Sequence, residues 1–108
     1  MATDARSQYD TVVDEVTATS PAKSSKMFGM PCLKNDSGKA FAGFYQEAMV
    51  FKLGGAAHAR ALALPGARLF DPMGGRPMKA WVEVPAAHAA FWLEFARQAL
   101  SYVAQEIA

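Results

Sequence analysis

Apolar residues near the start of the chain recur with the spacing of a helix. Most of them are three or four positions apart, so they line one face of a helix over residues 5–18. Thr3 or Asp4 can cap its first turn, and Pro21 stops it. The residues on this apolar face are Ala5, Tyr9, Val12, Val13 and Val16.

The next apolar stretches are short and rich in aromatic and branched side chains, which is typical of strands. Residues 27–33, 39–45 and 48–53 form three such stretches, separated by 35–38 and 46–47. Both separators have the length and residue types of hairpin turns, and the first ends in a glycine that can adopt a positive φ. The pattern predicts an antiparallel meander of three strands.

The second half of the chain alternates between helical and strand patterns. An alanine-rich stretch over 56–64 favours a helix that ends before Pro65. Two strands are predicted over 67–70 and 79–84, joined by a loop rich in glycine and proline. A long helix is predicted over 86–107.

The resulting order of elements is α-β-β-β-α-β-β-α. It predicts an α+β fold in which the helices pack against one five-stranded antiparallel sheet. Because 108 residues are enough for one hydrophobic core and too few for two, residues 1–108 are expected to form a single domain.

The last predicted helix carries two apolar stripes, which is more apolar surface than one contact requires. One interpretation is a second contact with another copy of the chain. The alternative is that the sheet and the first helix together cover both stripes. The first stripe contains Phe91, Trp92, Phe95, Ala99 and Tyr102, and the second contains Leu93, Ala96, Leu100, Val103 and Ile107.

Composition agrees with a domain that associates with a partner. The chain is 52% hydrophobic and 19% charged, richer in apolar residues and leaner in charge than an average soluble domain. No stretch approaches the roughly 20 consecutive apolar residues that span a bilayer. The N-terminus has no apolar signal-peptide core, and a single cysteine is consistent with a reducing compartment, so we expect a cytoplasmic protein.

Charge is unevenly distributed along the chain. Residues 1–22 have one basic and four acidic side chains, or −3, while residues 23–79 have nine basic and three acidic ones, or +6. The remainder has one basic and three acidic side chains, or −2. The middle segment is either an anion-facing patch or a solvated sheet beside acidic helices, and the second interpretation is favoured.

Nucleic-acid binding is an alternative function, because a sheet that presents aromatic and basic side chains together can stack bases. It is not favoured, since these aromatics are needed to fill a core and the chain has no recognised nucleic-acid-binding motif. The interleaved residues are Lys34, Lys39, Lys52, Arg68, Arg76 and Lys79 with Phe28, Phe41, Phe44 and Tyr45.

Four motifs follow one another along the chain: KMFG, KAFAGF, AMVFKL and GGRPMKAWVEVP. Together with the C-terminal helix they resemble the TfoX N-terminal-domain family, which is distantly similar to YjbR-like proteins, over roughly residues 24–104. The resemblance implies a two-layer α+β sandwich similar to secretion chaperones, which often pair as dimers. It supplies no catalytic residues. One departure is Met30-Pro31-Cys32, where the family commonly has a second glycine and an aromatic.

The stretch around Cys32 is the one place that raises the question of chemistry. A nucleophilic thiol needs a stabilised thiolate, and Lys34 shares a strand face with Cys32. A thiol-dependent enzyme is therefore a remote alternative, and a buried structural cysteine is the favoured interpretation. Pro31 cannot donate to a sheet ladder, so this strand is expected at a sheet edge or at a bulge, and Gly29 is expected to allow a bulge or close approach.

No metal, cofactor or catalytic site is predicted. His58 and His88 lie in alanine-rich stretches with no ligand spacing, and the glycine pairs lack the residues of a phosphate-binding loop. The leading hypothesis is a non-enzymatic, homodimeric protein-interaction or regulatory domain. Its expected partner surface comprises Leu93, Leu100, Arg76, Met78 and Phe28.

Overall fold

The computed structural model describes residues 4–27, 29–72, 74–75 and 77–105. Short turns connect most of the elements. In chain order the elements are α1 (Ala5–Thr19), β1 (Lys23–Met27), β2 (Met30–Lys34), β3 (Ala40–Tyr45), β4 (Ala48–Lys52), α2 (Gly55–Leu62), β5 (Arg68–Phe70), β6 (Met78–Pro85), the 3-10 helix η1 (Ala86–Phe91) and α3 (Trp92–Gln105).

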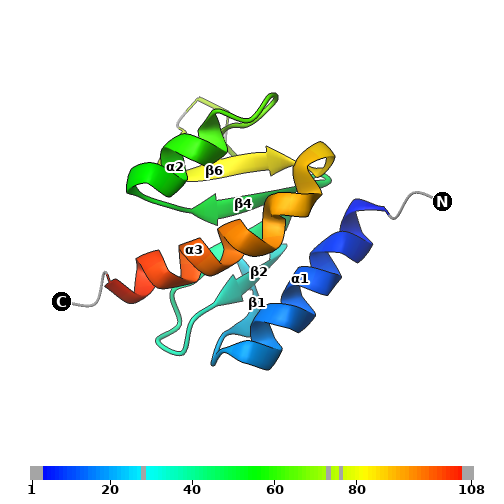
Figure 1. The fold of residues 1–108 in the computed structure, drawn as a ribbon, viewed down its shortest axis with the longest axis vertical. Helices are drawn as coiled ribbons and strands as arrows, with labels where there is room; N and C mark the ends of the chain where they lie inside the picture. Colours follow the sequence, from blue (N-terminus) through cyan, green and yellow to red (C-terminus); the bar gives the residue numbers. More distant parts are fainter. Residues whose placement is uncertain (1–3, 28, 73, 76, 106–108) are drawn as a thin grey trace.

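The strands form one antiparallel sheet with the order β1-β2-β3-β4-β6-β5. Figure 1 shows the three α-helices over one face of this sheet, with α3 crossing its middle and α1 beside α3. The predicted α+β class with an antiparallel sheet is confirmed. The predicted number of strands is wrong, because the sheet has six strands and not five.

The extra strand arises where one strand was predicted over residues 27–33. The chain instead forms a β1–β2 hairpin whose turn contains Gly29 at a φ of 75°. Gly29 therefore provides the positive φ of a turn. It does not form a bulge, and no other part of the described chain approaches it closely. Four of the five residues of β1 are exposed and polar, so no apolar alternation marks this strand in the sequence.

The predicted edge position of Pro31 is also wrong, because β2 lies between β1 and β3. Pro31 stands opposite Lys26 in β1, whereas the β2–β3 pairing begins one residue later at Cys32. The carbonyl oxygen of Pro31 lies 3.2 Å from where a Cβ on Gly43 of β3 would stand. The backbone N and O of a strand residue point toward the same neighbouring strand, so the nitrogen of Pro31 also faces β3. Because the β2–β3 pairing begins only at Cys32, the N–H that Pro31 lacks would lie beyond the end of that ladder.

The other predicted turns are confirmed. The Asn35 side chain accepts hydrogen bonds from the backbone N–H groups of Ser37 and Lys39, at 3.0 and 2.9 Å, and Gly38 has a φ of 83°. Gln46 and Glu47 both have positive φ, as a two-residue hairpin turn of the favoured twist requires.

The first helix matches its prediction. Asp4 caps it by accepting a hydrogen bond of 2.7 Å from the backbone N–H of Ser7, which fills one of the unpaired donors of the first turn. Its buried residues are Ala5, Tyr9, Val12 and Val16, four of the five on the predicted apolar face.

The last helix begins later than residue 86. Ala86–Phe91 is a 3-10 segment in which His88 is non-helical, at φ −110° and ψ 24°, and α3 begins at Trp92. The imidazole Nε2 of His88 lies 2.8 Å from the carbonyl oxygen of Pro65, which ties this segment to the loop after α2. The predicted end at Ile107 lies outside the described residues.

The main core lies between the helices and the sheet. In α3, the residues buried in it are Trp92, Phe95, Ala96, Ala99 and Val103, which come from both predicted stripes. The sheet and α1 therefore cover much of both stripes, as the alternative interpretation expected. In the described part of the chain, no helix combines the length and the apolar character needed to span a membrane.

Candidate functional site

The helical layer carries two large apolar side chains that are exposed. Among the described residues these are Phe91, with 44% of its surface accessible, and Leu62, with 38%. Leu62 ends α2 and Phe91 ends η1, immediately before α3. Large apolar side chains that are exposed on a folded domain are candidate contact residues for another protein.

An ion pair connects α2, which carries Leu62, with α3, which follows directly after Phe91. Arg60 of α2 donates a hydrogen bond to the carboxylate of Glu94 in α3, and both side chains are about half exposed. The Arg60 guanidinium also lies 5.5 Å from the ring centroid of Phe95, and the Phe95 and Phe91 centroids are 6.5 Å apart. We refer to Phe91, Arg60 and Glu94 together as the α2–α3 ridge, and Leu62 lies two residues beyond Arg60 at the end of α2.

The described members of the predicted partner set lie on opposite faces of the sheet. Leu93 and Leu100 are partly buried against the main core, on the helical side of the sheet. Met78 is partly buried in a second apolar cluster. Phe28 and Arg76 lie outside the described residues. The structure therefore does not bring the described members of this set into one surface.

Leu93 also lines a hollow of about 300 Å³ between α1 and α3, with Gln8 on its wall. Thr11 and Val12 line it from α1, and Ala89 lines it from η1. Leu93 is therefore partly accessible on the α1 side of α3.

The second apolar cluster covers the face of the sheet that the helices leave open. Its Tyr45 and Phe70 rings are in edge-to-face contact at 5.1 Å, and Phe70 and Trp81 are 6.5 Å apart. Phe70 and Trp81 are buried, so they cannot stack nucleotide bases in this conformation. The buried members are Met30, Val50, Phe70 and Trp81, with Met27, Ala40, Tyr45, Met78 and Ala80 packed at their margin.

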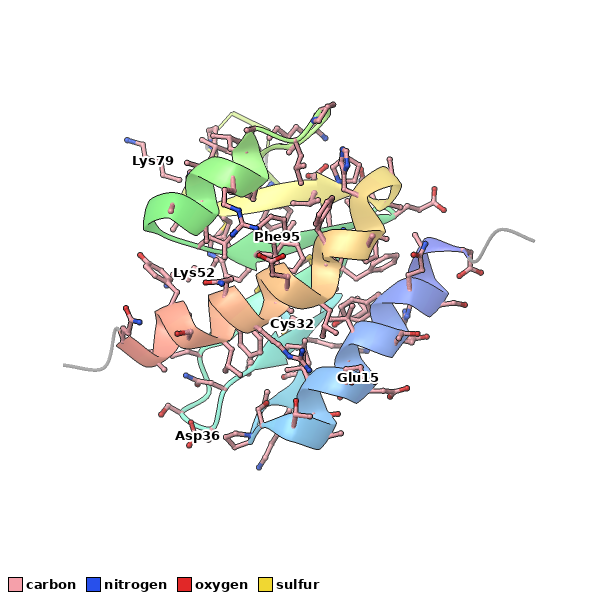
Figure 2. All side chains as sticks on the ribbon, in the orientation of Figure 1. Glu15, Cys32, Asp36, Lys52, Lys79 and Phe95 are labelled. Carbon is pink, nitrogen blue, oxygen red and sulfur yellow. The ribbon has the colours of Figure 1, made fainter. Side chains whose placement is uncertain are left out.

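The described basic side chains of residues 23–79 are dispersed over the strands, their turns and α2. Lys23 of β1 and Lys34 of β2 stand directly opposite each other. Figure 2 shows Lys52 and Lys79 on one side of the molecule, with Glu15 on α1 on the other. Arg68 is 3.3 Å from the carboxylate of Glu83, which neutralises part of the charge. This arrangement fits the interpretation of a solvated sheet beside an acidic helix.

Cys32 lies in the interior of the sheet and is fully buried. Burial raises the pKa of its thiol, and the opposing effect of Lys34 on that pKa is smaller. A raised pKa disfavours the thiolate that a nucleophilic cysteine needs. The two histidine rings bond backbone carbonyls, His58 to Lys79 at 2.9 Å and His88 to Pro65.

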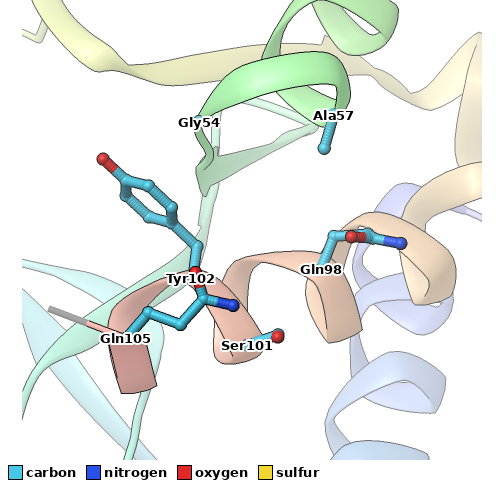
Figure 3. Close-up of a pocket in the computed structure, with 6 residues that line it drawn as sticks. All are labelled: Gly54, Ala57, Gln98, Ser101, Tyr102 and Gln105. Carbon is cyan, nitrogen blue, oxygen red and sulfur yellow. The ribbon is translucent and has the colours of Figure 1, made fainter.

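A small hollow of about 120 Å³ lies between the start of α2 and the end of α3 (Figure 3). A Cβ on Gly54 would stand 2.4 Å from the ring of Tyr102, so only glycine allows this close approach. None of the residues that line the hollow is charged. They are Gly54, Ala57, Gln98, Ser101, Tyr102 and Gln105.

The motifs that resemble the TfoX family fall in the β1–β2 hairpin, in β3 and β4, and in the loop and strand that end at Pro85. Within the described residues, no three His, Cys, Asp or Glu side chains gather where they could hold a metal ion. Comparison of the chain with protein-family models, with curated proteins and with solved structures found no match.

Proposed function

We propose that this chain is a non-enzymatic protein-interaction domain that forms a homodimer through the α2–α3 ridge. The exposure of Phe91 next to the Arg60–Glu94 pair of α2 and α3 is the observation that carries the proposal. The resemblance to the TfoX N-terminal-domain family supports it, because domains of the similar chaperone fold often pair.

Burial of Phe91 would supply a substantial part of the association energy. An exposed fraction of 44% corresponds to roughly 90 Å² of aromatic surface, or about 2 kcal/mol per protomer when it is removed from water. Two copies of Phe91 near a two-fold axis would form the apolar centre that self-association needs.

The charges of the ridge are compatible with two-fold pairing. Arg60 and Glu94 carry opposite charges and lie on neighbouring helices. In a two-fold dimer each protomer presents the same patch to the other, so Arg60 of one copy can meet Glu94 of its partner.

Light scattering after size exclusion tests the proposal. The native chain is expected to have the mass of a dimer at concentrations on the order of 100 µM, and Phe91→Asp is expected to be monomeric. Ala18→Asp, which places the same charge on an exposed position of α1, is the matched control and should remain dimeric. A native chain that is monomeric at this concentration would refute the homodimer.

Binding of single-stranded nucleic acid is the second candidate function, on one observation. Lys23 and Lys34 face each other across two strands, and like charges in this position repel. A phosphate bound between them would remove that repulsion. Fluorescence anisotropy of a labelled oligonucleotide at ~50 mM salt tests this function, which Lys23→Gln with Lys34→Gln should abolish.

A further inference from the structure

The edge strand β1 presents backbone groups that pair with nothing in the described part of the chain. β1 pairs with β2 alone, and the strand order places it at one end of the sheet. Lys26 stands opposite Pro31, whose N and O point toward β3. This pair therefore exchanges no hydrogen bonds, and the N–H and C=O of Lys26 point away from β2. Ser24, two residues earlier on the strand, has the same orientation.

This edge is accessible along most of its length. All four residues from Lys23 to Lys26 are exposed, and we refer to them as the β1 edge. A hollow of about 270 Å³ lies between β1 and α1, with Ser24 and Lys26 on one side and Asp10 on the other. Asp10 is already bonded to Arg6 at 3.0 Å. The helix therefore leaves room for the side chains of an added strand.

Three lysines give the β1 edge a positive charge. Lys23 and Lys34 stand opposite each other, and alternation places both on the open face of the sheet with Met27. Lys26 lies on the helical face. Among the described residues, none of these lysines forms an ion pair. Like charges on neighbouring strands repel, so an added strand that carries carboxylates would relieve this repulsion.

We propose that the β1 edge binds an extended acidic segment of a partner protein as an added strand, antiparallel to β1. The backbone of that segment bonds to the outward N–H and C=O groups of Ser24 and Lys26, as in β-augmentation. One carboxylate faces Lys23 and another faces Lys26. Because these lysines are three positions apart and lie on opposite faces, the segment needs two acidic residues separated by two others.

Two other occupants fit the β1 edge less well. Two copies of β1 paired around Ser25 would bring their lysines together without any carboxylate, and lysines on an edge strand disfavour such self-pairing. Nucleic acid can neutralise Lys23 and Lys34, but its backbone cannot continue the ladder at Ser24 and Lys26. The outward backbone groups and the charge together favour an acidic peptide.

Titration of the isotope-labelled full chain with a synthetic peptide, followed by NMR, tests the proposal. The peptide has about eight residues, is rich in valine and threonine, and carries two glutamates separated by two residues. Saturable shifts are expected in β1, and bound peptide should slow hydrogen exchange of the Ser24 and Lys26 amides. Replacement of both glutamates by glutamine should weaken binding about tenfold.

N-methylation of the peptide separates backbone pairing from attraction between charges. A methyl group on the nitrogen of the glutamate that faces Lys26 removes a hydrogen bond to the edge and blocks close approach. This peptide should show no measurable binding. A methyl group on the next nitrogen, which points away from β1 in an antiparallel pair, should leave the affinity nearly unchanged.

Variants of the protein test the same contacts from the other side. Lys26→Glu should weaken binding about fivefold, because an attraction across the strands becomes a repulsion. Lys79→Glu is the matched control, since Lys79 is exposed on β6, between β4 and β5. Ser24→Pro removes an outward N–H that β2 does not use, so it should abolish binding and keep the native NMR spectrum outside the β1–β2 hairpin.

Three results would overturn the proposal. The first is the absence of saturable shifts at millimolar peptide, including the case in which a labelled oligonucleotide shifts the same amides instead. The second is equal affinity of the two N-methylated peptides, which would indicate attraction by charge alone. The third is equal weakening by Lys26→Glu and Lys79→Glu. The Phe91→Asp chain should bind the peptide with native affinity, so this proposal and the ridge dimer fail separately.

Discussion

The indole N–H of Trp92 donates a hydrogen bond of 3.2 Å to the backbone carbonyl of Val84, inside the core. Trp92 is the first residue of α3, and Val84 lies near the end of β6. The bond closes the 3-10 segment between them and determines where α3 begins relative to the sheet. The same segment leaves the neighbouring Phe91 outside the core.

Replacement of Trp92 by Phe is expected to lower the free energy of unfolding by about 2–3 kcal/mol. The substitution removes the hydrogen bond and opens a cavity in a fully buried site. Urea denaturation followed by circular dichroism measures the change. Phe91→Ser alters the adjacent, exposed residue and should change the stability of the monomer by less than about 0.5 kcal/mol.

Much of the fold could be predicted from periodicity alone. The helix over Ala5–Thr19 and the hairpin turns around Gly38 and Gln46 carry apolar spacing or turn chemistry that acts locally. β1 has neither, because its polar residues pair with β2 through the backbone at a sheet edge. Its existence depends on tertiary pairing, which local pattern does not encode.

The candidate site was harder to predict, for a related reason. Phe91 matches the helical spacing of Phe95, but that spacing assumes an α-helix through both residues. Phe91 instead ends a 3-10 segment and is 44% exposed, although its ring stays near that of Phe95.

Gly54→Ala is expected to destabilise the protein by about 1–3 kcal/mol. The new Cβ would stand 2.4 Å from the Tyr102 ring, so either the ring or the start of α2 must move. Double-mutant analysis by chemical denaturation checks this cause. In a Tyr102→Ala background the same substitution should cost far less, and an unchanged cost would show that backbone conformation, not contact with the ring, requires glycine.

Stability is expected to fall at alkaline pH. Burial raises the pKa of Cys32 above its ordinary value of 9.0 and that of Tyr9 above its ordinary value of 10.0. The unfolded chain therefore releases these protons at a pH where the folded protein retains them, so rising pH favours unfolding. Each group should contribute a slope of up to about 1.4 kcal/mol per pH unit above its ordinary pKa.

Urea denaturation at several pH values between 8 and about 11 measures this dependence. In Cys32→Ala, the decrease in unfolding free energy that begins near pH 9 should be smaller than in the native chain. In Tyr9→Phe, the decrease that begins near pH 10 should be smaller. Identical pH profiles for the native chain and both variants would contradict the assignment. In agreement with its burial, Cys32 should also react with a thiol reagent only on unfolding.

A charge exchange within the ridge distinguishes pairing between protomers from pairing within one. If Arg60 of one copy meets Glu94 of the other, Arg60→Glu alone and Glu94→Arg alone each place like charges across the interface, and both variants should be monomeric. When the two variants are mixed, every contact between protomers again joins opposite charges. The mixture should therefore form a heterodimer, detected by light scattering or by pulldown through a tag on one variant.

The double variant within one chain is the control for this experiment. It carries both reversed charges, so it should form a homodimer like the native protein. If Arg60 and Glu94 interact only within a protomer, the single variants would instead lose a little stability and keep the native mass. Dimers in both single variants would thus place the two-fold contact elsewhere than on the ridge, and a mixture that stays monomeric would exclude exchange of this ion pair.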